Sequence, residues 1–140
     1  MMNTNYTNKQ TILWVDDDPD DIYLIRQVLN EIKFNSEMIP FQNGKEVIDH
    51  LSAIPKEAYP CLIILDINMP VMDGKQTLST LKKSNQFSSI PVIMFSTSNN
   101  TADKLFCQHF GAELVTKPST YNDLKGIVAN LVKGCSSALK

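Results

Sequence analysis

Short apolar runs recur along this chain and are separated by more polar segments. Five of them are rich in Val, Ile, Leu, Met and Phe and have the length of strands, namely residues 12–15, 38–41, 62–65, 92–95 and 114–116. Three of the five are almost wholly apolar, which is typical of strands buried on both faces of a sheet. The pattern therefore predicts five short strands, most of them in the interior of a layered domain.

The segments between and after these runs have the periodicity of helices. Their apolar residues recur at spacings of three and four, so each segment presents one apolar face. These positions are Ile22, Ile25, Val28, Leu29 and Ile32; Val47, Ile48 and Leu51; Leu78 and Leu81; Ala102, Leu105 and Phe106; and Leu124, Ile127, Val128 and Leu131. A strand followed by a helix, repeated five times, predicts an α/β fold with a doubly wound parallel sheet and helices on both faces.

Polar side chains directly follow four of the predicted strands. Asp16 and Asp17 follow the first strand, Asp66 the third, Ser96 the fourth and Lys117 the fifth. Sites in such sheets lie at the carboxyl ends of the strands, so we expect these residues to converge at one edge. Carboxylates about 4 Å apart repel each other by ~4 kcal/mol at an effective dielectric constant near 20, so the cluster requires a cation. Oxygen ligands favour Mg²⁺ where phosphate chemistry follows.

The stretch DDDPDD after the first strand holds five aspartates, and the last three have a structural explanation. Asp18 before Pro19 is a helix-start signature, with Asp18 as N-cap and Pro19 at the first helical position. Asp20 and Asp21 then lie in the first helical turn, where they oppose the positive end of the helix dipole. The first two aspartates are therefore the ones expected to hold the metal.

The carboxylate of Asp66 is suited to attack phosphorus, because phosphoryl transfer is catalysed largely by positioning and by charge neutralisation. Lys117 would supply a second cation beside the metal. Ser96 can donate a hydrogen bond to a phosphoryl oxygen, and Asn68 can offer its backbone carbonyl to the metal. Together these residues indicate a site that accepts a phosphoryl group.

Composition narrows the remaining possibilities. A chain of 140 residues that is 43% hydrophobic suits one domain. Three cysteines without ligand spacing predict a reducing compartment and buried or idle thiols, with no disulfide framework. The N-terminus MMNTNYTNKQ has no apolar core for a signal peptide, so we expect a cytoplasmic protein without a membrane partner. A formal net charge of -2 and the absence of basic runs disfavour direct nucleic-acid binding.

Four motifs resemble the landmarks of response regulator receiver domains, which form a CheY-like superfamily. They are ILWVDDD, LIILDINMPVMDG, IPVIMFSTS and VTKPS, and they occur in the same order as in that family. The resemblance implies a flavodoxin-like sheet with the strand order 2-1-3-4-5 and a stand-alone, single-domain response regulator. We expect a flexible N-terminus at residues 1–9, the receiver at 10–133 and a short C-terminal tail at 134–140.

The resemblance also implies a set of metal ligands. Asp16 and Asp17 match the acidic pair that holds Mg²⁺, for which Mn²⁺ can substitute. Asp17 and Asp66 would be direct ligands, and Asp16 would act largely through water. Asn68 matches the residue whose backbone carbonyl completes the metal shell. The MPVMDG turn resembles the loop that leads into the third helix, and its Gly74 is expected to serve the backbone conformation.

The implied chemistry is phosphoryl transfer to Asp66 from a sensor histidine kinase or a phosphotransfer protein. Ser96 matches a switch hydroxyl that moves toward the phosphate, and Lys117 matches a lysine that pairs with it. In the family the bond after this lysine is often cis, so a cis Lys117–Pro118 bond is expected. Such a protein is not a conventional enzyme, although it catalyses its own phosphorylation and dephosphorylation. We expect a monomer or weak homodimer that signals to a downstream protein.

Two departures from the family pattern bear on the output. Leu114 stands where the family usually has Tyr or Phe, so an aromatic switch is not assumed. Thr97 stands where the family usually has a small residue, and its bulk could restrict access to the acyl phosphate. His50 and His109 lie in amphipathic helices and are interpreted as surface or structural residues, not as relay histidines.

Three alternative functions remain open. A phosphorylation-independent docking scaffold keeps the fold without the chemistry. An aspartyl-phosphate hydrolase would use Asp66, but it typically has an acid two residues later, where this chain has Asn68. A flavodoxin-like cofactor binder would need a phosphate-binding loop after the first strand, and the aspartates there would repel a flavin phosphate.

Overall fold

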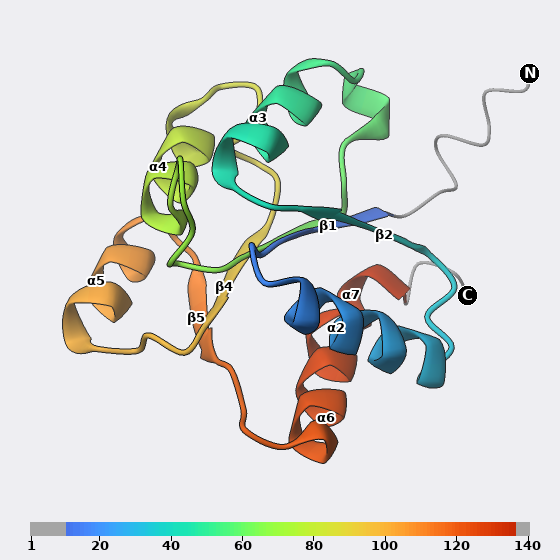
Figure 1. Cartoon of the computed structure of the whole chain (residues 1–140). Coiled ribbons are helices and arrows are strands. Elements are labelled where there is room, and N and C mark those ends of the chain that lie inside the picture. Colours follow the sequence, from blue (N-terminus) through green and yellow to red (C-terminus); the bar gives the residue numbers. More distant parts are fainter. Residues whose placement is uncertain (1–10, 137–140) are drawn as a thin grey trace, which may run out of the picture.

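The computed structural model describes residues 11–136, in which helices pack on both faces of a parallel sheet (Figure 1). The strands are β1 (Thr11–Val15), β2 (Glu37–Phe41), β3 (Leu62–Leu65), β4 (Val92–Ser96) and β5 (Glu113–Thr116). Every neighbouring pair is parallel, and the strand order is β2-β1-β3-β4-β5. The predicted doubly wound sheet and its strand order are confirmed.

The helices form one layer on each face of the sheet (Figure 1). One layer holds α3 (Gly44–Ser52), α4 (Gly74–Lys83) and α5 (Thr101–His109), and the other holds α2 (Pro19–Glu31), α6 (Tyr121–Leu131) and α7 (Lys133–Ser136). A short 3-10 helix, η1 (Lys56–Ala58), lies between α3 and β3. No helix within residues 11–136 is long and apolar enough to cross a membrane.

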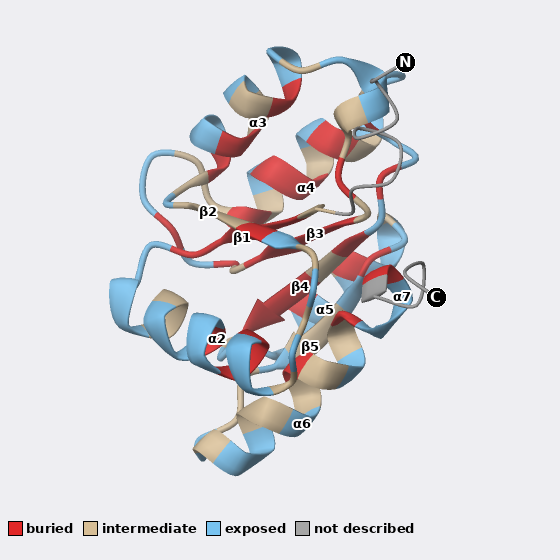
Figure 2. Ribbon diagram, turned by 90° about the vertical axis from the view of Figure 1, so that its right-hand side faces the viewer, coloured by how far each residue is buried: buried red, intermediate tan, exposed pale blue. Residues whose placement is uncertain are grey.

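Two hydrophobic cores lie between these layers, one on each face of the sheet. Side chains alternate along a strand, so Leu13 and Val15 of β1 face the α3 layer while Ile12 and Trp14 face the α2 layer. The central strands are buried from both sides (Figure 2). This explains why their sequences are almost wholly apolar, and it leaves the strand ends as the place where polar residues can gather.

A disulfide joins Cys61, just before β3, to Cys135 in α7, with a Cα–Cα distance of 5.9 Å. The expectation of idle thiols is wrong for this pair, because α7 folds back against the start of β3, a contact that the cysteine spacing does not reveal. The first residues of the segment expected as a C-terminal tail belong to α7, which ends at Ser136. Cys107 is free and buried, as expected. The expected flexible segment 1–9 and residues 137–140 lie outside the described residues.

Loss of the disulfide is expected to lower the free energy of unfolding by about 2 kcal/mol or more, because it closes a long loop in the unfolded chain. The two cysteines are 74 positions apart in the sequence. Urea unfolding of the wild type with and without reductant would measure the effect. The double variant Cys61→Ser/Cys135→Ser is the control, because its midpoint should not respond to reductant. An equal midpoint for oxidised and reduced wild type would contradict the prediction.

Candidate functional site

Two aspartates continue β1 beyond its last residue. The Asp16 N–H donates to the Phe41 carbonyl at 2.9 Å, so the backbone here still pairs with β2. Asp16 is only 3% exposed, whereas Asp17 is exposed. The backbone N–H of Asp18 donates to Asp16 Oδ1 at 2.9 Å and fixes this carboxylate.

Asp66 brings a third carboxylate to the same edge of the sheet. Its N–H donates to the Val15 carbonyl at 3.0 Å, which places the end of β3 beside the end of β1. Ligand oxygens of Asp16, Asp17 and Asp66 all lie within 4.8 Å of one another. Carboxylate oxygens so close together suit a hard divalent cation. The Asn68 N–H donates to Asp66 Oδ1 at 3.4 Å, and binding of metal by the Asn68 carbonyl stays a prediction.

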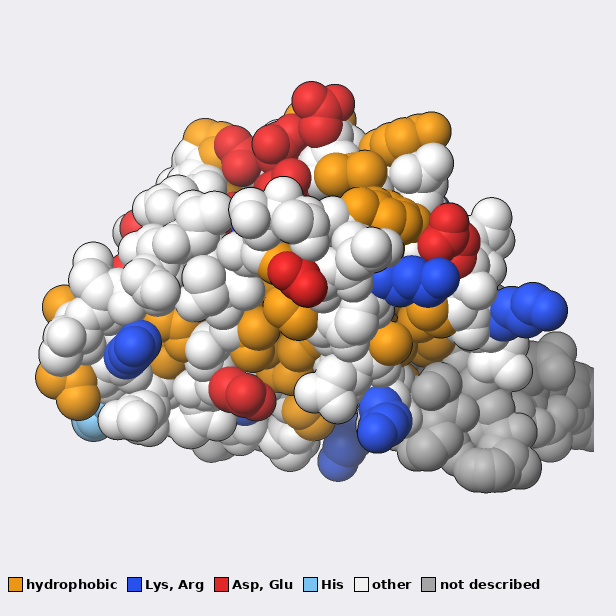
Figure 3. All heavy atoms as spheres, turned by 90° about the horizontal axis from the view of Figure 1, so that it is seen from below, with side chains coloured by type: hydrophobic (Ala, Val, Ile, Leu, Met, Phe, Trp, Pro, Cys, Tyr) orange, Lys and Arg blue, Asp and Glu red, His pale blue; other side chains and the backbone are white. Residues whose placement is uncertain are grey.

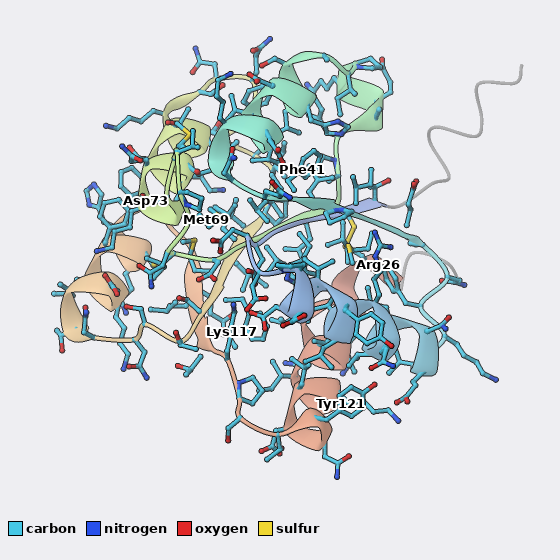
Figure 4. All side chains as sticks on the ribbon, in the orientation of Figure 1. Arg26, Phe41, Met69, Asp73, Lys117 and Tyr121 are labelled. Atoms are coloured by element: carbon cyan, nitrogen blue, oxygen red, sulfur yellow. A yellow bond between two sulfur atoms is a disulfide. The ribbon has the colours of Figure 1, made fainter. Side chains whose placement is uncertain are left out.

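Lys117 reaches into this acidic cluster from the loop after β5 (Figure 4). The backbone N–H of Lys117 donates to the Ser96 carbonyl at 3.0 Å, which aligns the ends of β4 and β5. The ammonium Nζ lies 2.8 Å from Asp16 Oδ2, 2.9 Å from Asp21 Oδ2 and 3.0 Å from Asp66 Oδ2. The predicted convergence of Asp16, Asp66 and Lys117 is therefore present.

The charges in this cluster perturb one another. Burial raises the pKa of Asp16 to about 6, although the hydrogen bond from Lys117 acts in the opposite direction. Burial would lower the pKa of Lys117, but hydrogen bonds to Asp16 and Asp21 outweigh this and hold it above its ordinary value. The lysine is therefore charged, and a second cation would further stabilise ionised Asp16.

Asp21 belongs to the site, although its sequence position indicated only a role in the helix dipole. Asp18 and Pro19 begin α2 as predicted, and Asp18 Oδ1 accepts the Asp20 N–H at 2.9 Å. Asp21 is one residue further on, and its carboxylate bonds Lys117. The signal in the sequence was that α2 begins right beside the end of β1, so its first turn must face the same edge.

Ser96 ends β4 and is fully buried. Its Oγ accepts a hydrogen bond from the backbone N–H of Ser98 at 3.2 Å. Thr97 between them is exposed. Leu114 pairs with Met94 across β4 and β5 and packs against the core on the α5 side. An aliphatic side chain thus fills the position where the family usually has an aromatic ring.

The backbone of Gly74 lies so close to the backbone of Asp66 and Ile67 that a side chain would not fit there. Its N–H donates to the Ile67 carbonyl at 2.8 Å, and a Cβ added there would lie 2.1 Å from the Asp66 carbonyl oxygen. The positive φ in this loop belongs to Val71, at 67°. The Met72 N–H donates to the Pro70 carbonyl at 2.7 Å and closes the turn around Val71. The loop from Ile67 to Asp73 therefore brings the start of α4 into close contact with the backbone of Asp66.

The expected cis bond before Pro118 is wrong. Residues 11–136 contain no cis peptide bond, so Lys117–Pro118 is trans. Trans is the favoured isomer before proline by about 0.5–1 kcal/mol. The Lys117 ammonium reaches the three carboxylates with this bond trans.

One group of acidic side chains lies at an edge of the face shown in Figure 3. Seen from below the view of Figure 1, this group lies along the upper rim, single Asp or Glu side chains lie elsewhere on the face, and the Lys and Arg side chains lie away from the rim (Figure 3). This matches the sequence, where five of the fifteen acidic residues lie between Asp16 and Asp21. A third of the acidic residues thus lie in one short segment, as expected for a cation site.

A sequence model of the response regulator receiver domain matches residues 12–129. The chain belongs to the response regulator receiver family. The receiver is similar to protein PilH of Pseudomonas aeruginosa, with 32% identity over 108 residues that cover 76% of this chain and 84% of PilH. It is also similar to response regulator Rcp1 of Synechocystis, with 31% identity over 97 residues that cover 67% of this chain and 66% of Rcp1.

Solved receiver structures agree with this fold over most of the chain. The phosphorylated cyanobacterial phytochrome response regulator RcpA superposes with a TM-score of 0.82 and 28% identity, covering 94% of this chain and 97% of RcpA. The Mn²⁺-bound form of Rcp1 superposes with a TM-score of 0.79 and 27% identity, covering 89% of this chain and 92% of Rcp1. In this receiver, the carboxylates of Asp16, Asp17 and Asp66 form a group that could hold a metal ion.

Proposed function

We propose that this receiver is a single-domain response regulator that accepts a phosphoryl group on Asp66 from a sensor histidine kinase or a phosphotransfer protein. The surroundings of Asp66 carry the proposal. Lys117 Nζ lies 3.0 Å from Asp66 Oδ2, and ligand oxygens of Asp16 and Asp17 lie within 4.8 Å of those of Asp66. Cations at these positions overcome the repulsion between a carboxylate nucleophile and an anionic phosphoryl group.

In the proposed transfer, a carboxylate oxygen of Asp66 bonds to phosphorus while the phosphorus–nitrogen bond of a phosphohistidine breaks. The electron pair of that bond stays on the imidazole nitrogen, and Asp66 becomes an acyl phosphate. Lys117 would neutralise one phosphoryl oxygen, and Ser96 would donate a hydrogen bond to another. Because the chain supplies these groups, it would catalyse its own phosphorylation and, with water as the nucleophile, its dephosphorylation.

We propose Mg²⁺ as the bound cation, with Mn²⁺ as a substitute. Asp17 and Asp66 would bind it directly, the Asn68 backbone carbonyl would complete the shell, and Asp16 would act largely through water. The cation would offset the charge of the carboxylates and of the transferring group. The donor set of the described residues supports this choice, and a relative has been solved with Mn²⁺.

The proposed output is contact with a downstream protein or passage of the phosphoryl group along a relay, by a monomer or weak homodimer. We place it in the cytoplasm, where ATP-dependent kinases act, although a disulfide such as Cys61–Cys135 is uncommon there. The His50 ring packs at a tilt against Phe41 with 5.0 Å between ring centres, and His109 packs edge-on against Phe110 at 4.8 Å. These contacts support structural roles for both histidines.

Intact-mass measurement after incubation with acetyl phosphate and Mg²⁺ tests the proposal. We expect the wild type to gain the mass of one phosphoryl group, and Asp66→Asn to gain none because an amide is not a suitable nucleophile. Asp49→Asn is the control, since Asp49 is an exposed residue paired with Lys45 on α3. No gain in the wild type would favour the docking scaffold, whereas an equal gain in Asp66→Asn would show that another residue accepts the phosphoryl group and would overturn the proposal. Multiple-turnover release of phosphate from a model ester would favour the hydrolase.

A further inference from the structure

Asp103 is a buried carboxylate outside the site described above. It lies in the first turn of α5 and is only 5% exposed. Its Oδ1 forms an ion pair with Lys75 Nζ, and its Oδ2 accepts a hydrogen bond from Ser98 Oγ. Its backbone N–H donates to Asn100 Oδ1 at 2.8 Å. A charge at this depth persists because both of its oxygens have partners.

The two partners of Asp103 come from the start of α4 and from the loop after β4. Lys75 follows Gly74, whose N–H binds the Ile67 carbonyl next to Asp66. Ser98 lies two residues after Ser96 and donates its N–H to Ser96 Oγ. Asp103 therefore connects the start of α4 with the loop after β4, where α4 and α5 lie next to each other (Figure 1).

The network is held tightly on the Lys75 side. The Lys75 ammonium also lies 5.4 Å from the centre of the Phe106 ring, a cation–π distance. Hydrogen bonds from Lys75 and then from Ser98 hold the pKa of Asp103 below its usual range, so the carboxylate stays ionised at neutral pH. Removal of one partner would leave a buried polar group without a hydrogen-bond partner, which is unfavourable, so the three side chains hold one another in place.

We propose that Asp103 is a positioning residue for Ser96, which it restrains through Ser98 in the conformation that is not engaged with a phosphoryl group. When Ser96 Oγ turns toward a phosphoryl group on Asp66, the Ser98 N–H loses its acceptor. Ser98 cannot follow while its hydroxyl is bonded to Asp103. The Lys75–Asp103–Ser98 network thus favours the resting state, and its loss shifts the equilibrium toward the engaged state. This inference rests on the proposed function of Asp66.

Binding of beryllofluoride, a phosphoryl mimic, tests this restraint in the presence of Mg²⁺. Trp14 is the single tryptophan of the chain, and its ring lies edge-on to Phe95, the residue before Ser96, at 6.0 Å. Its fluorescence can therefore report both Mg²⁺ binding and beryllofluoride binding. We expect Asp103→Ala and Lys75→Met to bind beryllofluoride about fivefold more tightly than the wild type, with unchanged Mg²⁺ affinity. The double variant should gain no more than either single variant.

Matched controls separate this effect from helix electrostatics. Asp123 lies three residues after the N-cap of α6, as Asp103 does in α5, but it is exposed. Lys45 follows Gly44 at the start of α3, as Lys75 follows Gly74 in α4, but its ion pair is with the exposed Asp49. Asp123→Ala and Lys45→Met should bind beryllofluoride as the wild type does.

The outcomes distinguish the two proposals. If the wild type binds no beryllofluoride and takes no phosphoryl group, the proposed function fails. If the wild type binds it and Asp103→Ala binds equally or more weakly, the function stands and the restraint is overturned. Should Asp103→Ala prove unfolded by circular dichroism, Ser98→Ala decides, because it removes the hydroxyl alone and leaves the Lys75–Asp103 ion pair. Ser98→Ala must then also bind beryllofluoride more tightly.

Discussion

Replacement of Lys117 by methionine is expected to lower the free energy of unfolding of the metal-free protein by about 4 kcal/mol at pH 8, the range for breaking a buried ion pair. Its ammonium bonds Asp16, Asp21 and Asp66, and the side chains of Asp16 and Lys117 are only 2% and 14% exposed. Without the lysine, these carboxylates repel one another with no cation between them. Urea unfolding with EDTA present measures the loss.

The loss should be smaller at pH 5 than at pH 8. The folded-state pKa of Asp16 is about 6, above its ordinary value of 3.8. The contribution of this raised pKa to stability is therefore complete below 3.8 and is lost as the pH rises through about 6. Removal of Lys117 takes away a group that lowers this pKa, so Asp16 would be largely protonated at pH 5 and the repulsion would be relieved. Added Mg²⁺ should also restore stability at pH 8, because it replaces the missing cation.

Lys125→Met provides the control for this prediction. Lys125 pairs with Glu31 at 3.3 Å, and both side chains are about half exposed. An exposed pair of this kind contributes about 0.2–1 kcal/mol, so its loss should be small and nearly independent of Mg²⁺. Equal losses for Lys117→Met at pH 5 and pH 8, or no response to Mg²⁺, would show that Lys117 does not act by neutralising the carboxylates.

Gly74→Ala is expected to lower the free energy of unfolding by about 3 kcal/mol, because overpacking against backbone is costly. The added Cβ would lie 2.1 Å from the Asp66 carbonyl oxygen and 2.7 Å from the Ile67 Cα, neither of which can move without shifting the end of β3. We therefore also expect weaker Mg²⁺ binding and slower phosphorylation. Urea unfolding and intact-mass measurement report the two effects separately.

Gly126→Ala is the matched control, since Gly126 lies inside α6 and a Cβ there meets nothing within 4 Å. This variant should gain about 0.5–1 kcal/mol, because alanine is the better helix former. If Gly74→Ala were as stable as the wild type and kept its Mg²⁺ affinity, the close approach of α4 to Asp66 would not constrain the site.

Local features of the fold could be predicted from the sequence alone. The central strands were placed correctly because apolar runs of this length are buried on both faces of a sheet, and the start of α2 because Asp18 and Pro19 act within one turn. Asp16, Asp66 and Lys117 were brought together correctly because parallel strands place their carboxyl ends at one edge.

Contacts between distant segments depended on how the helices pack. The role of Asp21 depends on the rotation of α2 about its axis, which brings its carboxylate to Lys117. The Cys61–Cys135 bond depends on α7 returning to β3, and the Asp103 network on the spacing between α4 and α5. Hydrophobic periodicity and capping act over a few residues and can be read along a chain. The distances between elements follow from side-chain packing across the whole domain, which no local pattern encodes.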